Sequence, residues 1–355
     1  MNAEPPDHDH GAVVLTCRDL AANQAFFAAL GFRLLVIFPA DDPRVASLSG
    51  FGLCVRLERG ERDGGGHLRL PGAPARTCVA PNGARIDIVP GETAATADAP
   101  ATFVVSRQAD AAKWLEGRAG MLYRDLIPGR QGGALVASHI RIPRGGPVPD
   151  YVHFHKVSAQ VIYCKAGWVR VVYEDQGEPF VMRAGDCVLQ PPEIRHRVLE
   201  CSDGLEVIEV SAPAEHVTCV EHAMTLPTTV RRPDRMFAGQ RFVWHRAEHA
   251  TWNAWDLAGW LARDTGIGAA TEGAIDVRVM RAQTPSARTF VHGDARRFWC
   301  VLHGEVEVEQ GTEAHVLQSG GACMLPPHAA ISLRAAADAE FLEVRFVIAT
   351  LARQS

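Results

Sequence analysis

Three histidines and one glutamine have the residue types and the spacing that could hold a metal ion. His153 and His155 lie two positions apart in a segment typical of a strand, so their side chains project to the same face. Gln160 follows on the next strand, and His196 on a strand more distant in the sequence. Two imidazoles inside a narrow barrel would be costly to bury without partners, and a metal ion supplies one. Neutral imidazole binds several divalent transition metals, so we expect one such ion at these four residues.

The four residues belong to two patterns anchored by glycine. The first pattern, G-x6-H-x-H-x4-Q-x6-G, runs from Gly146 to Gly167, and the second, G-x5-P-x4-H, runs from Gly185 to His196. Both patterns resemble the two motifs of the cupin family. The resemblance implies a β-barrel with a metal at its centre, held by the three histidines and the residue at position 160.

Position 160 departs from the commonest cupin pattern, which has glutamate there. Gln160 is uncharged, so three histidines and an amide leave the double positive charge of a metal largely unneutralised. Such a metal should favour an anionic substrate or polarise a carbonyl group. Gln160 is either a weak ligand or a residue that lies behind the three histidines.

The region from about 120 to 350 contains an internal repeat. Met121–Asp125 matches Trp260–Asp264, Gly167 matches Gly304, and Gly185 matches Gly321, at nearly constant separation. Residues 168–173 and 305–309 alternate apolar and polar side chains, which is typical of strands with one buried face. Many short antiparallel strands predict two jelly-roll barrels. The whole region resembles a bicupin.

The second copy lacks most of the candidate ligands. At the positions equivalent to the four ligands it has Phe290, His292, Arg297 and Ser332. One histidine does not hold a transition metal. We expect the second barrel to be structural, or to bind an organic anion through Arg297.

Other polar residues lie close to the ligands in sequence. Tyr151 is in phase with His153, and His139 lies on the preceding strand, so we take both as candidate catalytic proton donors or acceptors. Glu206 and Glu209 recur as Glu340 and Glu343 in the copy that lacks the ligands. We therefore expect these glutamates to serve the fold.

The first 100 residues form a different kind of module. A strand at Ala12–Cys17 precedes a helix that ends at Gly31, the glycine-rich stretch 60–74 is expected to be a loop, and further strands are expected at 32–38, 45–48, 53–57 and 85–89. This β-α-β-β-β order resembles one module of the vicinal oxygen chelate (glyoxalase) family. Ala12 stands where that family often has a histidine, and the acidic position is Asp87. We expect a scaffold or dimerisation module here.

Composition limits the remaining possibilities. The 355 residues are 47% apolar and 22% charged, with a net charge of -5, so a packed protein is expected and a nucleic-acid partner is not. No apolar run reaches the ~18 residues of a membrane span, and the N-terminus lacks a signal sequence, which predicts a cytoplasmic protein without a membrane partner. The nine cysteines include no CxxC pair, which favours reduced thiols.

The sequence thus predicts a mainly β protein with a glyoxalase-like module at 1–100, a metal-binding cupin barrel at 101–235 and a second barrel at 236–355. Bicupins of this size include ring-cleaving dioxygenases. The resemblance implies an Fe(II) dioxygenase acting on a small anionic, oxygen-rich or aromatic substrate, with nickel, zinc or manganese as other candidate metals. Two alternatives remain: a metal-dependent isomerase or lyase on a sugar acid or keto acid, and a bicupin that binds a ligand without turnover. A homodimer is expected.

Overall fold

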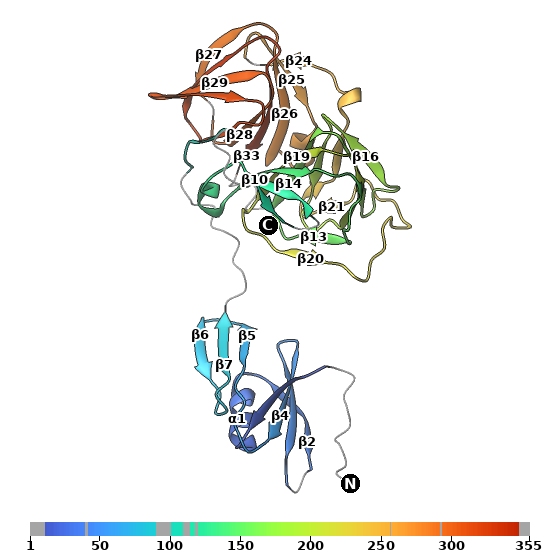
Figure 1. Ribbon diagram of the computed structural model, residues 1–355, viewed down its shortest axis with the longest axis vertical. Coiled ribbons are helices and arrows are strands. Elements are labelled where there is room, and N and C mark those ends of the chain that lie inside the picture. The colour runs from blue at the N-terminus through green and yellow to red at the C-terminus, as the bar shows by residue number, and fades with distance from the viewer. Residues whose placement is uncertain are drawn as a thin grey trace. The chain divides into compact units, whose positions relative to one another are not determined.

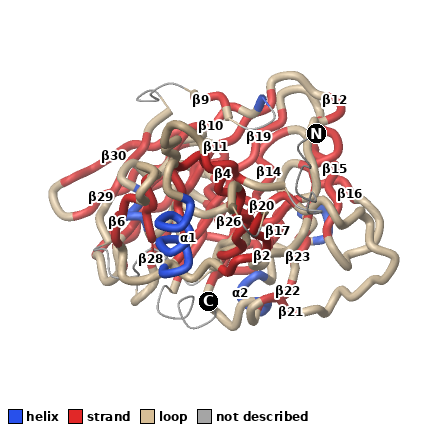
Figure 2. Tube along the Cα trace, turned by 90° about the horizontal axis from the view of Figure 1, so that it is seen from below, coloured by secondary structure: helices blue, strands red, loops and turns tan. Residues whose placement is uncertain are grey.

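A computed structural model of the chain describes residues 11–39, 42–89, 101–108, 114–117, 120–255, 257–291 and 293–347. The chain divides into two compact units, Met1–Thr93 and Ala94–Ser355. Strands predominate in both units, and helices are few and short (Figures 1 and 2). The mainly β class expected from the sequence is confirmed, while the finer division at residue 235 remains a prediction. Among the described residues, no helix has the length and apolar character needed to cross a membrane.

The N-terminal unit has the expected β-α-β-β-β order. Its elements are β1 (Val13–Cys17), α1 (Leu20–Ala29), β2 (Arg33–Phe38), β3 (Val45–Gly50) and β4 (Leu53–Arg59). The sheet order is β1-β4-β3-β2, with β1 parallel to β4. Asp19 starts the helix because its side chain accepts a hydrogen bond from the amide of Ala22 at 2.9 Å. The resemblance to the glyoxalase family stays a prediction.

The glycine-rich stretch 60–74 is not a loop throughout, which corrects the expectation from the sequence. It contains β5 (His67–Pro71), which joins β6 (Arg76–Val79) and β7 (Arg85–Val89) in the order β5-β7-β6. Leu68 and Leu70 alternate with exposed residues and enter the core of the unit. The neighbouring glycines obscured this short alternation in the sequence.

The carboxylate of Asp87 on β7 contacts side chains from all three strands of this small sheet. Its carboxylate accepts hydrogen bonds from Thr77 at 2.7 Å and Arg85 at 3.0 Å, and contacts His67 at 2.7 Å. These partners, Thr77 first, hold the pKa of Asp87 well below its usual value.

The first barrel is built from two sheets. The strands are β9 (Leu115–Glu116), β10 (Leu122–Asp125), β11 (Val136–Ile142), β12 (Gly146–Pro147), β13 (His153–His155), β14 (Ala159–Ala166), β15 (Trp168–Tyr173), β16 (Phe180–Arg183), β17 (Cys187–Gln190), β18 (His196–Cys201), β19 (Leu205–Ala212) and β20 (Thr218–Val220). One sheet has the order β17-β14-β19-β11-β10-β9, and the other has the order β16-β15-β18-β13-β20, with β12 beside β18. A short 3-10 turn covers Arg130–Gly133.

The second barrel repeats this plan. Its elements are β24 (Asn253–Ala254), β25 (Trp260–Asp264), α2 (Ile267–Ala270), β26 (Ile275–Ala282), β27 (Ser286–Val291), β28 (Arg296–His303), β29 (Glu305–Gln310), β30 (Glu313–Gln318), β31 (Ala322–Leu325), β32 (Ala330–Ala335) and β33 (Glu340–Phe346). The order β25-β26-β33-β28-β31 reproduces β10-β11-β19-β14-β17, and β27-β32-β29-β30 forms the second sheet. The internal repeat predicted from the sequence is therefore visible in the strand order.

The two barrels exchange edge strands. β8 (Val104–Ser106) precedes the first barrel in sequence but pairs with β31 of the second. β23 (Val243–His245) precedes the second barrel but pairs with β17 of the first. Between these elements, β21 (Met236–Phe237) pairs with β22 (Gln240–Arg241), and a 3-10 turn covers Ala247–His249.

One hydrophobic core joins the barrels. It combines Val161, Ile208 and Val210 of the first barrel with Phe298 and Leu342 of the second. The same faces lie side by side in Figure 1, where β14 and β19 approach β28 and β33. Together with the exchanged strands, this shared core makes the two barrels one structural unit.

The interior of the second barrel is filled by aromatic and paired polar side chains. Trp260, Trp299 and Phe341 are at most 1% exposed, and the ring centroid of Phe341 lies 5.4 Å from that of Trp260 and 4.8 Å from that of Trp299. Arg297 and the indole of Trp299 both donate to the Glu343 carboxylate, at 2.9 and 2.8 Å. Arg297 therefore binds an internal glutamate. His292 lies outside the described residues.

We expect Glu343→Ala to destabilise the protein strongly, because it leaves the largely buried Arg297 and Trp299 without their acceptor. The loss in free energy of unfolding should be about 3–5 kcal/mol, measured by urea denaturation. Glu340→Ala is the matched control, because the Arg281–Glu340 pair is more exposed. This substitution should lower the free energy of unfolding by no more than about 1 kcal/mol. Equal losses in the two variants would contradict this account of the second barrel.

Candidate metal centre

Strand pairing brings the three histidines together. His153 of β13 lies directly opposite His196 of β18, and His155 projects from the same face of β13 as His153. The ring centroids of His153 and His196 are 4.2 Å apart, and those of His155 lie 5.1 and 5.3 Å from them. One potential ligand nitrogen of each histidine lies within 4.8 Å of the others. Two sequence motifs about forty residues apart thus converge on one point.

Each imidazole is oriented through its Nδ1 atom. His153 Nδ1 donates to the carbonyl of Tyr151 at 2.8 Å, and His196 Nδ1 donates to the carbonyl of Ile194 at 3.0 Å. His155 Nδ1 lies 2.9 Å from the hydroxyl of Thr218. A protonated Nδ1 leaves the lone pair on Nε2, which is the form of histidine that binds a metal.

The donor set therefore fits a divalent transition metal. Three neutral nitrogen donors on one side of a cavity suit iron, zinc, nickel or manganese to different degrees. A carboxylate lies behind the set: Asp150 Oδ1 is 3.6 Å from His153 Nδ1, and both side chains are about 1% exposed. Such a partner raises the basicity of the imidazole.

Gln160 faces the same space from the opposite sheet. It lies on β14, pairs across the strands with Gln190 of β17, and is 1% exposed. Both glutamines line the cavity that also contains the three histidines. The structure thus brings together all four candidate ligands named from the sequence.

The cavity has a volume of about 90 Å³ and an otherwise mainly apolar wall. Tyr173 of β15 is part of this wall and stacks on His196, with ring centroids 5.5 Å apart and an interplanar angle of 25°. Burial raises the pKa of Tyr173 well above its usual value, so the phenol keeps its proton. Tyr173 was not among the site residues predicted from the sequence, although it alternates in phase with Val169 and Val171, which also line the cavity.

Glu209 of β19 also lines the cavity. The sequence had predicted a structural role for this residue, and its place in the cavity wall differs from that prediction. In the second barrel the equivalent Glu343 accepts from Arg297 and Trp299. The corresponding positions in the first barrel are Gln160 and Ile162, opposite Ser211 and Glu209 on β19. The glutamate at this equivalent position therefore lies in a filled interior in the second barrel and in a cavity wall in the first.

The structure does not bring His139 to this cavity. Ile140 and Ile142 of β11 line the cavity, so the intervening side chains of the strand point to the other face. There His139 is 3% exposed, with Nε2 3.0 Å from Glu206 and Nδ1 3.2 Å from Arg124. Burial lowers the pKa of His139, and a neutral ring that donates to Glu206 and accepts from Arg124 agrees with both contacts.

Tyr151 lies beside the metal centre and not in the cavity wall. Its side chain is 43% exposed, and its ring meets that of His153 edge to face at 5.9 Å. Its carbonyl holds His153 in place. A further histidine, His216, meets His155 at 5.4 Å from the segment after β19 and was not singled out in the sequence.

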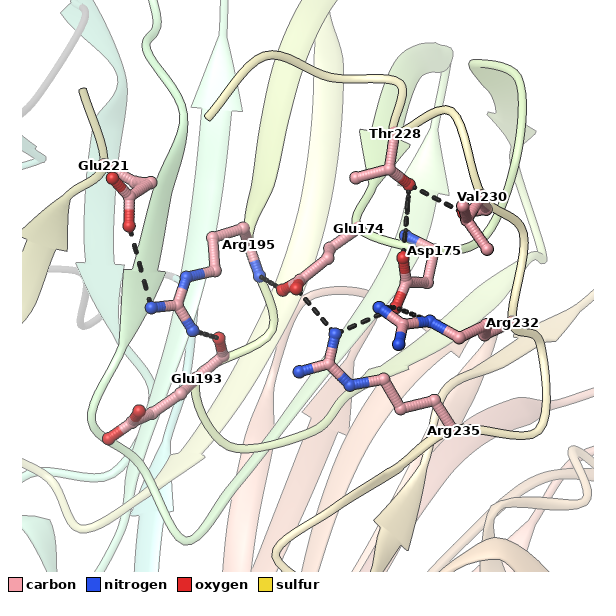
Figure 3. A network of polar contacts seen from close by, with 9 residues as sticks. All are labelled: Glu174, Asp175, Glu193, Arg195, Glu221, Thr228, Val230, Arg232 and Arg235. Carbon is pink, nitrogen blue, oxygen red and sulfur yellow. Dashed lines mark hydrogen bonds and ion pairs between the residues drawn. The ribbon is translucent and has the colours of Figure 1, made fainter. Parts of the chain in front are cut away.

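A network of ion pairs and hydrogen bonds lies beside the start of β18, the strand that carries His196 (Figure 3). Asp175 accepts from Arg232 at 2.9 Å and from Arg235 at 2.8 Å, and Glu174 accepts from Arg235 at 2.6 Å. Glu174 also accepts from the amide of Arg195, the residue before His196, at 3.3 Å. The network thereby fastens residues 228–235 to the turn after β15 and to the start of β18.

Comparisons with known proteins agree with this geometry. Residues 138–210 match the model of the cupin domain. The chain is similar to a salicylate 1,2-dioxygenase from Pseudaminobacter salicylatoxidans, with 14% identity, a TM-score of 0.56, and 71% of this chain and 86% of that chain covered. It is also similar to an oxalate decarboxylase from Lactobacillus farciminis, with 16% identity, a TM-score of 0.51, and 68% and 85% covered. No curated protein matches the chain in sequence.

Identities this low establish the fold alone. The chain therefore contains a cupin domain and shares the two-barrel cupin architecture of these structures.

The Glu206 contacts predict a pH-dependent contribution to stability. The hydrogen bond from His139 and then the Lys165 ammonium lower the pKa of Glu206 from its ordinary 4.5 to about 2. A lowered carboxyl pKa stabilises the fold above pH 4.5, and this stabilisation is lost as the pH falls through about 2. Glu206→Gln should cost roughly 2–3 kcal/mol near neutrality, and the difference from wild type should shrink in acid. Urea denaturation at several pH values measures it. Glu200→Gln is the control, because Glu200 is more exposed than Glu206 and its ion pair with Arg170 is longer, at 3.4 Å. A constant difference would contradict the assignment.

The Thr218 hydroxyl predicts a dependence of metal affinity on a residue that is not a ligand. Thr218→Val removes the partner of His155 Nδ1, so zinc binding should weaken roughly 10-fold or more. Competition with a chromophoric chelator measures the affinity. Thr289→Val is the matched control, because Thr289 bonds Ser332 on the surface of the second barrel. Unchanged affinity for Thr218→Val would show that the hydroxyl does not orient the ligand.

Proposed function

We propose that the chain is a metal-dependent cupin enzyme, an Fe(II) dioxygenase that acts on a small, oxygen-rich substrate. His153, His155 and His196 are the proposed ligands, with Gln160 as a weak fourth donor or a neighbour of the metal. The observation that carries the proposal is the set of three imidazoles, each fixed through Nδ1, on the wall of a small apolar cavity. The similar salicylate 1,2-dioxygenase, of which one structure is an adduct with gentisate, supports this choice.

Ferrous iron held by these residues would supply Lewis acidity toward substrate oxygens and one-electron chemistry toward O2. The residues of the chain have separate tasks. The apolar wall excludes water, and the phenol of Tyr173 offers a proton beside His196. The Glu209 carboxylate can accept a proton from a substrate in the cavity. We propose Tyr173 and Glu209 for these tasks in place of His139 and Tyr151, because they line the cavity.

A second candidate is a metal-dependent lyase or isomerase acting on a keto acid or sugar acid. Glu209 and Tyr173 favour it, since a carboxylate and a protonated phenol on one cavity wall can move a proton without O2. The similarity to an oxalate decarboxylase also points this way. The homodimer and the cytoplasmic location stay predictions from the sequence.

We expect protein purified without added metal or chelator to contain about one iron per chain, and His196→Ala to contain almost none. Elemental analysis measures the metal, and an oxygen electrode with a panel of catechols, gentisate, diketones and thiols measures turnover. His249→Ala, an exposed histidine near the second barrel, should match wild type in both assays.

The outcomes separate the candidates. Turnover that survives strict anaerobiosis, or that nickel or zinc restores, favours the lyase or isomerase. Metal binding with no turnover in either atmosphere favours a binding protein. Absence of metal in the wild type, even after reloading, would falsify the metal site.

A further inference from the structure

The cavity of the first barrel has a polar end and an apolar end, and the strand register defines both. On β14, Gln160 is followed by Ile162, and on β18, His196 is followed by Val198. Tyr173 pairs with His196, and Val171 pairs with Val198. These three strands therefore present a polar residue at the level of the histidines and an aliphatic residue one step further along.

On β19 the same change from a polar to an aliphatic residue comes one step later, because Glu209 lies level with Ile162. Gln160 lies opposite Ser211, Ile162 opposite Glu209, and Cys164 opposite Val207. Along β19, the cavity wall changes from Glu209 to Val207 and then to Leu205, which lie opposite Ser138, Ile140 and Ile142 of β11, respectively. Met182 pairs with Val169 and closes the apolar end.

Among the described residues that line the cavity there is no arginine or lysine. The nearby cations have other contacts: Arg141 reaches Glu206 at 3.5 Å on the outer face of β11, and Arg195 lies over the ring of Phe154 and 3.7 Å from Glu221. Glu209 adds a carboxylate to the wall. At the apolar end the one phenol of the described wall, that of Tyr123 opposite Ile140, donates to the Met121 sulfur at 3.5 Å. A negatively charged group placed there would lose its hydration and gain no cationic partner, which is costly.

The cavity is also small. Its volume of about 90 Å³ is below the ~150 Å³ of a dry cavity that accommodates benzene. The part of a ligand that lies inside the cavity must therefore be compact, with its oxygen atoms close to the histidines and its remaining atoms against the aliphatic residues.

We propose that the substrate is a compact molecule whose oxygen atoms lie together at one end and whose remainder is neutral and apolar. This inference rests on the proposed metal site and concerns the part of the substrate that does not bind the metal. It differs from the anionic substrate expected from the sequence, because that expectation considered only the charge of the metal and not the wall of the cavity.

The test compares two hydroxamates that chelate a metal through the same two oxygens. Propionohydroxamic acid ends in a methyl group, and malonomonohydroxamic acid carries a carboxylate in its place. We expect zinc-loaded protein to bind the first more tightly by roughly 100-fold, since the carboxylate enters a cavity whose described wall gives it no cation. Isothermal titration calorimetry measures both affinities, and each is corrected for the affinity of the hydroxamate for free zinc.

Two variants of one residue at the apolar end provide the matched comparison. Met182→Lys introduces a cation of similar length and should raise the relative affinity for the carboxylate ligand roughly 10-fold or more. Met182→Gln introduces polarity without charge and should leave the preference near that of wild type. Thermal denaturation and zinc content establish that each variant is folded and loaded, and Val169→Lys replaces Met182→Lys if the latter fails these checks.

Equal affinities, or a preference for the carboxylate in zinc-loaded wild type, overturn the inference and leave the metal site intact. Zinc binding without binding of either hydroxamate shows that the metal offers no open position, which overturns the inference together with the proposed enzyme. A protein that does not bind zinc, or binds it equally well after His153→Ala, overturns the metal site itself.

Discussion

The direct pairing of His153 with His196 is the constraint on which the metal centre depends. β13 is only three residues long and lies between β18 and β20. Because side chains alternate in a strand, a slip of one residue would turn both histidines of β13 away from His196. The carbonyls of Tyr151 and Ile194, which accept from the two rings, precede each histidine by two residues and so fix the ring orientation within the same register.

The surroundings of β13 support this register from several sides. The ion pairs around Asp175 and Glu174 anchor the segment that follows β20 and the residue before His196 (Figure 3). The exchanged strand β23 completes the opposite sheet beside β17, and the shared core holds that sheet against the second barrel. The second barrel therefore contributes to the site by stabilising the sheet that carries Gln160.

The two barrels show how one frame can enclose either a packed interior or a cavity. In the second barrel, Arg297 and Trp299 donate hydrogen bonds to the Glu343 carboxylate. The equivalent positions in the first barrel are Gln160 and Ile162, which lie opposite Ser211 and Glu209 of β19. A buried carboxylate with two donors forms a closed polar cluster. In the first barrel Gln160 and Ile162 stand at the positions of those two donors, and Glu209 lines the cavity that contains the histidines.

The sequence by itself determined the candidate ligands, the repeat and most strands, because glycine-anchored motifs and alternating apolar residues are local signals. It did not determine which face of β11 His139 occupies, since two-residue alternation fixes relative phase and not direction. It also gave no sign that Tyr173 stacks on His196, or that Glu209 lines the cavity. The short strand β5 was hidden among glycines. These features depend on contacts between strands distant in the chain, which only the tertiary structure decides.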